Sequence, residues 1–353
     1  MTATVPRVAL APGYSISRVL KGGWQLAGGH GAIDAGAAVA DMAAFVAAGI
    51  TTFDCADIYT GVESLIGGFL RTRGVAGVQV HTKYVPDRAT LGAITAADVR
   101  AAVDRSRARL GLETLDLVQF HWWDYDRPGM IDVARWLTDQ QTRGAVRHLG
   151  ATNFGTAALA SLVDAGVPIV AHQVQYSVLD RRPAGTMAAL CAAHGIGLLC
   201  YGALAGGFLS QRYLGMPEPA GLENRSLVKY RLIIEEIGGW ARLQRILRVL
   251  ADVGRRHEAG LGAVAVAWVL AQPQVAGVIV GARHAGHLAD TVRAATLALD
   301  AADLAAIADV CADGAAVPGD VYDLERTKGG RHAAVMRYDL NRSTEAAGPS
   351  ASG

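Results

Sequence analysis

The sequence has few cysteines and few charged residues for a chain of 353. Its four cysteines, Cys55, Cys191, Cys200 and Cys311, are scattered, without the C-x-x-C pairs of a zinc site or the density of a disulfide scaffold. Charged residues make up 18% of the chain, and 33 Lys and Arg against 32 Asp and Glu leave a net charge of +1. Because no long block of one sign could neutralise a phosphate backbone or an anionic lipid surface, we expect neither nucleic acid nor membrane as a partner.

The sequence also lacks a hydrophobic run long enough to cross a bilayer. The longest apolar stretch, around Leu261 to Ala271, is far short of the about 18–20 residues that a span needs. The N-terminal segment MTATVPRVALAPG has no sustained apolar core before a cleavage site, so no secretory signal is visible and a cytoplasmic location is expected. A hydrophobic fraction of 51% still supports a sizeable core, which predicts a folded globular protein.

Short β-branched runs alternate with segments of helical periodicity along most of the chain. Strands are expected at residues 17–22, 51–54, 78–85, 115–122, 146–152, 169–176, 197–201 and 275–281. Helices are expected at residues 36–48, 63–73, 96–110, 131–143, 156–165, 184–194, within 243–270, and at 287–295. Strict alternation predicts parallel strands joined by right-handed crossovers, either closed into a barrel or spread as a doubly wound sheet.

Eight such units favour the closed form, a single-domain (β/α)8 TIM barrel over residues 1–340. A doubly wound sheet would place G-x-G-x-x-G after its first strand, and the nearest match, Gly260 to Ala265, follows a polar helical stretch and is attributed to helix packing. Two segments depart from the alternation: residues 203–239, expected to form an ordered flap over the barrel mouth, and a polar C-terminal extension at 317–353. Residues 341–353 lack large apolar side chains and are expected to be a disordered tail.

Polar side chains lie in, at or just past the ends of six different predicted strands. They are Asp54, Lys83, His121, Asn153, Gln173 and Tyr201. Because the active-site residues of α/β barrels gather at the C-terminal ends of the strands, we expect these side chains to meet in one site. An isolated Asp54 could instead cap a helix, but a Lys and a His in or beside buried strands are costly unless they have partners.

Six segments together resemble one known family. The segments are FDCADIY (53–59), HTK (81–83), DLVQFH (116–121), GATNF (150–154), QVQY (173–176) and YGALAGG (201–207). They resemble the aldo-keto reductases, in which an Asp at a strand end is followed five residues later by a Tyr, and the resemblance extends over roughly residues 17–313. It implies reduction of an aldehyde or ketone to an alcohol by hydride transfer.

The resemblance implies catalytic roles for Asp54, Tyr59, Lys83 and His121, and the chemistry of a carbonyl agrees with it. Hydride addition develops negative charge on the carbonyl oxygen, so a donor must supply a proton at that moment. A phenol with a pKa of about 10 donates poorly at neutral pH unless a nearby cation favours the phenolate. Tyr59 is therefore the expected acid, with Lys83 as the cation and Asp54 as its partner, while His121 is expected to donate to the carbonyl oxygen and orient it. No metal is needed.

The family binds a nicotinamide dinucleotide across the barrel top without a Rossmann turn. By family position Asn153 and Gln173 hold the carboxamide and Tyr201 stacks on the ring. The remaining expected cofactor-binding residues are Gly23, Trp24, Asp54, Thr152, Gly202, Ala203, Leu204, Gly281, Arg283 and His287. NADP(H) is favoured over NAD(H) because Arg283 could hold the 2′-phosphate as a bidentate fork. His287 could equally be a solvated helix-start residue, and NAD(H) stays open.

Trp24, Trp122 and Trp123 are expected to surround a small-molecule carbonyl or alcohol substrate, with core packing as the alternative for the adjacent pair. Asp124 and Asp126 follow that pair and disfavour a strongly acidic substrate. A second hypothesis is a cofactor-binding regulatory subunit of the same fold with slow or no turnover. The sequence leaves the oligomeric state open.

Overall fold

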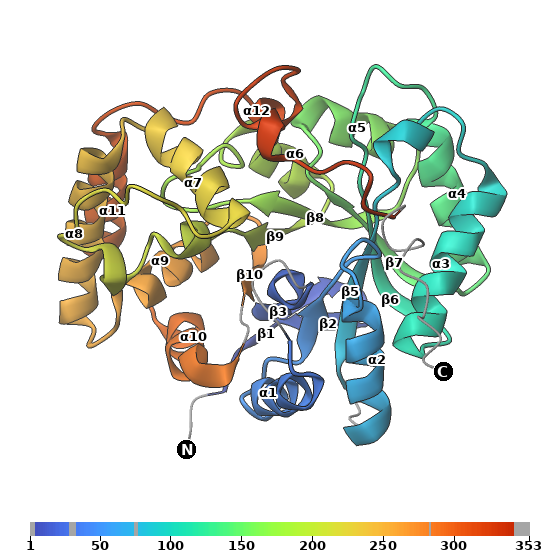
Figure 1. Cartoon of the computed structure of the whole chain (residues 1–353), viewed down its shortest axis with the longest axis horizontal. Helices are drawn as coiled ribbons and strands as arrows, with labels where there is room; N and C mark the ends of the chain where they lie inside the picture. Colours follow the sequence, from blue (N-terminus) through green and yellow to red (C-terminus); the bar gives the residue numbers. More distant parts are fainter. Residues whose placement is uncertain (1–3, 28–32, 74–76, 282–283, 342–353) are drawn as a thin grey trace.

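A computed structural model describes residues 4–27, 33–73, 77–281 and 284–341. Eight parallel strands close into a barrel in the order β10-β3-β4-β5-β6-β7-β8-β9 (Figure 1), which confirms the predicted (β/α)8 TIM barrel. The barrel strands are β3 (Val19–Gly22), β4 (Thr52–Asp54), β5 (Gln79–Tyr84), β6 (Leu115–Phe120), β7 (Val146–Thr152), β8 (Ile169–Gln175), β9 (Gly197–Tyr201) and β10 (Val275–Gly281). Because all eight are parallel, their C-terminal ends lie at the same end of the barrel, and Asp54, Thr152 and Tyr201 are each the last residue of a strand.

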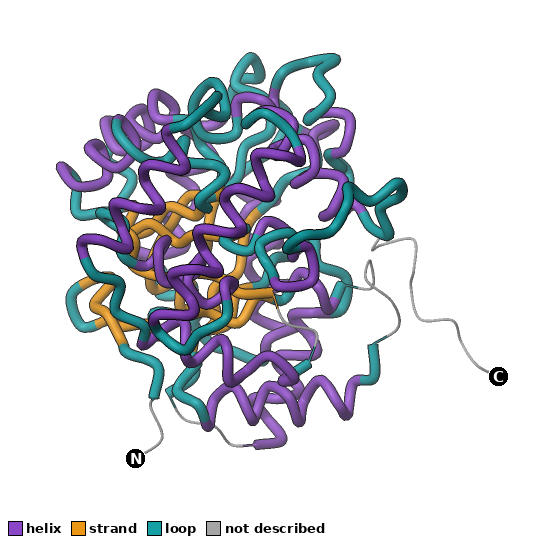
Figure 2. The backbone as a smooth tube through the Cα atoms, turned by 90° about the vertical axis from the view of Figure 1, so that its left-hand side faces the viewer, coloured by secondary structure: helices purple, strands orange, loops and turns teal. Residues whose placement is uncertain are grey.

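Helices enclose the strands, as Figure 2 shows, and most follow the predicted ranges within two residues. They are α1 (Ala35–Ala47), α2 (Val62–Arg73), α3 (Ala96–Leu110), α4 (Met130–Thr142), α5 (Thr156–Asp164), α6 (Thr186–Ala193), α7 (Arg225–Glu236), α8 (Trp240–Arg256), α9 (Leu261–Leu270), α10 (Leu288–Thr296), α11 (Ala301–Ala312) and α12 (Asp323–Arg326). The start of α3 shows why local sequence is sufficient there: Thr95 and Asp98 form a reciprocal capping box. No helix among these described residues is long and apolar enough to cross a membrane.

A hairpin precedes the barrel, and the predicted first strand at 17–22 is wrong in part. The structure divides it between β2 (Tyr14–Ser17), which pairs antiparallel with β1 (Arg7–Ala11), and barrel strand β3. The turn contains Gly13 at φ +71°, a conformation that glycine adopts without steric cost. Leu10, Tyr14 and Ile16 pack with inward residues of the barrel, so the hairpin closes the N-terminal end opposite the site.

The long connection after β9 is ordered around a helix that the sequence analysis did not identify, α7. Tyr230 of α7 packs against the first residue after β9: a Cβ on Gly202 would lie 2.4 Å from Tyr230 Oη, and Gly202 has φ +76°. Glycine is therefore required at that position. The predicted helical stretch 243–270 is two helices, α8 and α9, separated near Glu258, whose φ is +50°.

The polar C-terminal extension is packed against the barrel as far as residue 341. Val317, Val321 and Tyr322 are buried, and Asn341 donates from Nδ2 to the carbonyl oxygen of Val85 at 2.8 Å. Sparse apolar residues at long intervals gave no periodic signal from which this packing could be predicted. Of the tail predicted at 341–353, residues 342–353 lie outside the described residues.

Candidate active site

Asp54 and Lys83 form a buried ion pair where β4 and β5 end. Lys83 Nζ lies 2.6 Å from Asp54 Oδ2, and both side chains are about 95% buried. Lys83 Nζ also donates to the carbonyl oxygen of Cys55 at 2.8 Å and stands 5.1 Å from the centroid of the Tyr59 ring. Three of the four predicted catalytic residues are thus brought together.

The charges in this cluster bear directly on proton transfer. Burial opposes the charged form of Lys83, but Asp54 and Tyr59 outweigh it and hold the pKa of the ammonium above its ordinary value. Burial raises the pKa of the Tyr59 phenol, while the Lys83 ammonium acts against that rise. Lys83 is therefore a permanent cation beside a phenol whose negative form it favours.

Two amide side chains complete the surroundings of Asp54. Gln119 and Gln173 donate from Nε2 to Asp54 Oδ1 at 3.0 and 2.7 Å, and Gln173 also donates to Gln119 Oε1 at 2.9 Å. Gln119 was not among the predicted site residues. The signal was present, because residues two apart in a strand share a face and Gln119 precedes His121 by two.

His121 has the opposite hydrogen-bonding character to the one expected. Its Nδ1 lies 3.0 Å from the carbonyl oxygen of Thr152, which only accepts, so Nδ1 carries the proton. Burial, followed by the charge of Arg326, lowers the pKa of His121 to about 3, so the ring is neutral at pH 7. Nε2 therefore carries a lone pair, and it is buried without a partner among the described residues. In this form His121 accepts a hydrogen bond at the site rather than donating one.

The free energy of unfolding is expected to depend on pH through three buried histidines. The contribution of one of them, His172, can be measured by substitution. Burial lowers the pKa values of His81, His121 and His172 to about 3, each below the ordinary value of about 6.5. Between pH 6.5 and 3 such a histidine takes up a proton in the unfolded state but not in the folded state. The stability that it contributes above pH 6.5 is therefore lost as the pH falls towards 3. His172→Gln keeps an acceptor for the N–H of Phe154, which His172 Nε2 now accepts at 3.1 Å.

We expect the free energy of unfolding of the wild type, relative to His172→Gln, to fall by about 1.4 kcal/mol per pH unit between about pH 6 and 4. Urea unfolding of both proteins at several pH values measures this difference. Contributions from carboxyl groups cancel in the comparison. Parallel stability curves would contradict a neutral His172 in the folded state.

The predicted carboxamide-binding residues have the polarity that a primary amide requires. Asn153 Oδ1 accepts from Tyr201 Oη at 2.8 Å, which leaves Nδ2 to donate. Gln173 uses Nε2 towards Asp54 and Gln119, which leaves Oε1 to accept. One donor and one acceptor on adjacent strands complement the oxygen and the nitrogen of a nicotinamide carboxamide, so these residues fit the cofactor that the resemblance implies.

Tyr201, the predicted stacking residue, ends β9 beside a half-buried lysine that the sequence analysis did not identify. Lys229 Nζ stands 5.0 Å from the centroid of the Tyr201 ring and 3.5 Å from Tyr201 Oη. After β9, Ala203 is buried and Leu204 half-buried, next to the tight turn at Gly202. The backbone amides predicted to bind a pyrophosphate therefore directly follow Tyr201 in the chain.

The remaining predicted cofactor residues come from two other segments, one after β3 and one at the end of β10 and beyond it. Gly23 donates to the carbonyl oxygen of Asp54 at 2.7 Å, and a Cβ there would lie 2.8 Å from Val62. Trp24 is 41% exposed and packs edge-on against Tyr59 at 5.1 Å. Gly281 ends β10 and His287 is an exposed residue directly before α10, whereas Arg283 lies outside the described residues. Among the described residues no cluster of His, Cys, Asp or Glu could hold a metal ion.

The two adjacent tryptophans have different environments. Trp122 is fully buried in the core and donates from Nε1 to the carbonyl oxygen of Asp124, so it offers no surface to a substrate and fits the core-packing alternative. Trp123 is half-buried and packs edge-on against the His121 ring at 4.2 Å. Both tryptophans lie just past the end of β6 at Phe120.

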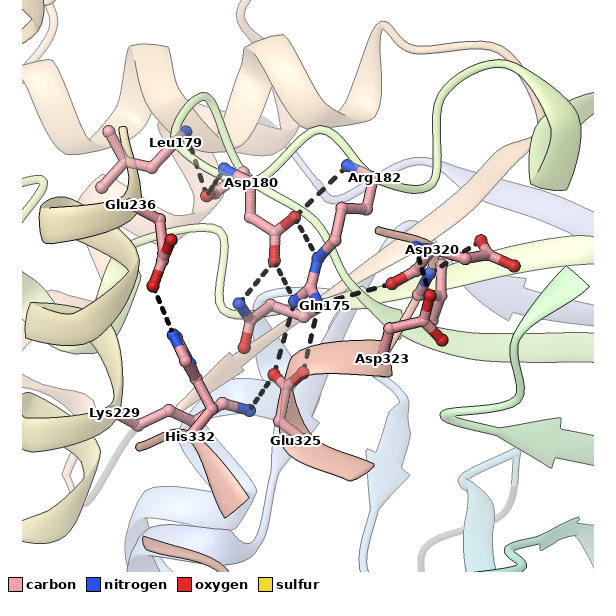
Figure 3. Close-up of polar contacts among 12 residues, drawn as sticks. Gln175, Leu179, Asp180, Arg182, Lys229, Glu236, Asp320, Asp323, Glu325 and His332 are labelled. Atoms are coloured by element: carbon pink, nitrogen blue, oxygen red, sulfur yellow. Dashed lines mark hydrogen bonds and ion pairs between the residues drawn. The ribbon is translucent and has the colours of Figure 1, made fainter. Parts of the chain in front are cut away.

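A buried ionic network fastens the C-terminal extension beside the site (Figure 3). Arg182 donates to Asp180 at 2.7 Å and to Glu325 of α12 at 3.1 Å, and Lys229 Nζ lies 3.9 Å from Glu325. Two cations face two carboxylates, so the buried charges are balanced. Tyr322 lies three residues before Glu325 in the same segment, and its ring lies edge-on to His121 at 5.9 Å.

Comparisons with known proteins bear on the fold and the family of the chain. A model described as the Aldo/keto reductase family matches residues 18–312. Flagellar radial spoke protein 5 of Chlamydomonas reinhardtii is 34% identical over 254 residues, which cover 60% of this chain and 48% of that protein, so the chain spans about half of that relative. The NADH-specific methylglyoxal reductase of Escherichia coli is 23% identical over 82% of this chain and 93% of its own. A solved glycerol dehydrogenase from Gluconobacter oxydans shares the fold, with a TM-score of 0.74 and 23% identity over 90% of this chain and 98% of that one.

Proposed function

The chain belongs to the aldo/keto reductase family of oxidoreductases, and from that premise we propose that it reduces an aldehyde or ketone to an alcohol with Tyr59 as the general acid. The observation that carries the proposal is the buried pair of Lys83 and Asp54, with Lys83 Nζ 5.1 Å from the Tyr59 ring. Stability alone is a poor explanation for a buried ion pair, because an apolar pair of similar volume often stabilises the fold as well. A fixed cation beside a phenol has a direct use in proton transfer.

In the proposed reaction each residue has a defined task. The bound nicotinamide supplies the hydride. Tyr59 holds the proton at Oη and releases it to the carbonyl oxygen, while Lys83 stabilises the phenolate that remains. Asp54 keeps Lys83 charged and in position. His121, neutral and accepting at Nε2, orients a hydroxyl, either that of Tyr59 or that of the product alcohol.

We propose NADP(H) as the preferred cofactor, on the basis of Arg283, with Asn153, Gln173 and Tyr201 holding the nicotinamide end. The family admits either cofactor, since one relative is named an NADH-specific reductase. The proposal therefore depends on the guanidinium of Arg283 reaching the 2′-phosphate, a group that NAD(H) lacks.

A second candidate function is a cofactor-binding subunit of a larger assembly. The observation that favours it is the relative named a flagellar radial spoke protein, which is more than twice as long as the matched segment. The complete set of Asp54, Tyr59, Lys83 and His121 favours turnover, because a purely structural barrel has no use for a buried cation beside a phenol.

Oxidation of NADPH and of NADH by the purified protein, followed at 340 nm across a panel of aldehydes and ketones, tests the function. We expect carbonyl-dependent oxidation, with a lower KM for NADPH than for NADH. Cofactor binding without turnover on any carbonyl would favour the subunit. A preference for NADH would overturn the assignment of Arg283 while leaving the reaction intact.

A further inference from the structure

Arg326, the last residue of α12, is a cation with unfilled hydrogen-bond donors. It lies beyond residue 312, where the family match ends. Its guanidinium stands between two rings, 4.3 Å from the centroid of Tyr125 and 5.0 Å from that of Tyr322. Nη2 donates to the carbonyl oxygen of Trp122 at 2.8 Å, but Nε and Nη1 are buried without an acceptor among the described residues. Buried N–H groups of a charged side chain are costly when unfilled, so this arrangement needs an explanation.

Arg326 lies in the wall of a cavity that begins next to the active site. The cavity has a volume of about 570 Å³ and lies between the loop after β6 and the C-terminal extension. Trp123 and Tyr322 form part of its wall, and both rings also pack against His121, at 4.2 and 5.9 Å. Two rings of the cavity wall therefore also contact a predicted catalytic residue.

The charges around the cavity leave Arg326 as the cation without a carboxylate partner among the described residues. The other charged side chains of the wall are already paired: Arg88 with Asp124 at 3.3 Å, Lys328 with Asp126 at 2.9 Å, and Glu325 with Arg182 at 3.1 Å. Asp124 and Asp126, which in the sequence disfavour an acidic substrate, are neutralised in this way. Arg326 is therefore the guanidinium of this wall that a negatively charged ligand group could still pair with.

We propose that Arg326 binds an anionic group on the substrate, so that the preferred carbonyl compounds carry a carboxylate or phosphate away from the reacting carbon; this rests on the proposed carbonyl reduction. A guanidinium binds either anion through two parallel N–H groups, and in Arg326 the second N–H of Nη2 forms such a pair with the unfilled N–H of Nε or of Nη1. The rings of Trp123 and Tyr322 enclose the carbon skeleton between the two ends. Arg326 is then a specificity-determining residue, supplied by a segment that the family match does not include.

Matched substrate pairs test this without any variant. Succinic semialdehyde is compared with butanal, terephthalaldehydic acid with para-tolualdehyde, and glyceraldehyde 3-phosphate with glyceraldehyde. We expect the wild type to favour the anionic member of at least one pair in kcat/KM. A preference confined to the first two pairs identifies a carboxylate, one confined to the third identifies a phosphate, and both support the proposal.

Substitution of Arg326 then assigns the preference to this residue. Arg326→Gln should lower the ratio of kcat/KM for the anionic over the neutral member by about ten- to a hundredfold, mainly through KM. Arg326→Lys keeps the charge but loses the fork, so an intermediate ratio is expected. Lys328→Gln makes the same change of charge in the same wall at a cation that is already paired, and it should leave the ratio at the wild-type value.

The failures of the two proposals are distinguishable. If no carbonyl compound is reduced, the proposed function itself is wrong. If the wild type reduces both members of every pair equally well, carbonyl reduction stands and the anion site is overturned. An equal fall for both members in Arg326→Gln also overturns the anion site, and it assigns Arg326 to the packing of the extension against Tyr125.

Discussion

Tyr59→Phe is expected to lower the turnover number by about 10²–10⁴-fold, the usual contribution of a positioned general acid, while cofactor affinity stays close to that of the wild type. The phenyl ring still packs against Trp24, so the substitution removes only the hydroxyl. Without that hydroxyl the alkoxide formed by hydride addition has no proton donor beside Lys83. Steady-state rates with the best carbonyl substrate, together with fluorescence titration of the cofactor, measure the two quantities separately.

Tyr84→Phe is the matched control for this experiment. Tyr84 is also a buried tyrosine at a strand end, but its ring stacks on Phe120 in the core, away from the ion pair. Its substitution should change turnover little. Near-normal turnover in Tyr59→Phe, or an equal loss in both variants, would remove Tyr59 from the proposed role and leave the family membership unaffected.

The barrel was predictable because its signals are local. Each strand is a short apolar run, and each helix has its own periodicity, so the order of elements follows without any knowledge of contacts. The C-terminal ends of parallel strands must meet at one end of a barrel. That rule predicts that Asp54, Lys83, Gln173 and Tyr201 lie in one region.

What was missed depends on contacts between distant parts of the chain. The pairing of Arg182 with Glu325 joins residues 143 apart, and nothing near either residue predicts it. The orientation of His121 likewise depends on the carbonyl oxygen of Thr152, a backbone atom on the next strand. The hairpin before the barrel, in contrast, has a local signal in the Pro12-Gly13 turn, which the sequence analysis did not use.

Lys83→Met is expected to lower turnover about as strongly as Tyr59→Phe, because the phenol loses the cation that favours its ionised form. Removing one partner of a buried ion pair costs about 3–5 kcal/mol of stability. Here Gln119 and Gln173 still donate to Asp54 Oδ1 at 3.0 and 2.7 Å, so we expect the barrel to remain folded. Thermal unfolding followed by circular dichroism verifies this before rates are compared.

Lys21→Met is the control for Lys83→Met, because it removes a different buried lysine. Lys21 is 4% exposed in β3 and stands 5.3 Å from the ring of Phe45, outside the cluster around Tyr59. Burial lowers the pKa of Lys21 to about 8, so its charged form is also disfavoured by burial. We expect Lys21→Met to keep turnover near the wild-type value, whereas a loss equal to that in Lys83→Met would point to general damage to the barrel.

The double variant Tyr59→Phe/Lys83→Met decides whether the two residues act as a unit. If Lys83 acts only by favouring the ionised form of the Tyr59 phenol, removing it from an enzyme that already lacks the hydroxyl costs little more. The double variant should then be about as slow as the slower single variant rather than slower by the product of the two factors. Fully multiplicative losses would mean that Lys83 acts on the substrate or cofactor independently of Tyr59, and that the contact at 5.1 Å is packing alone.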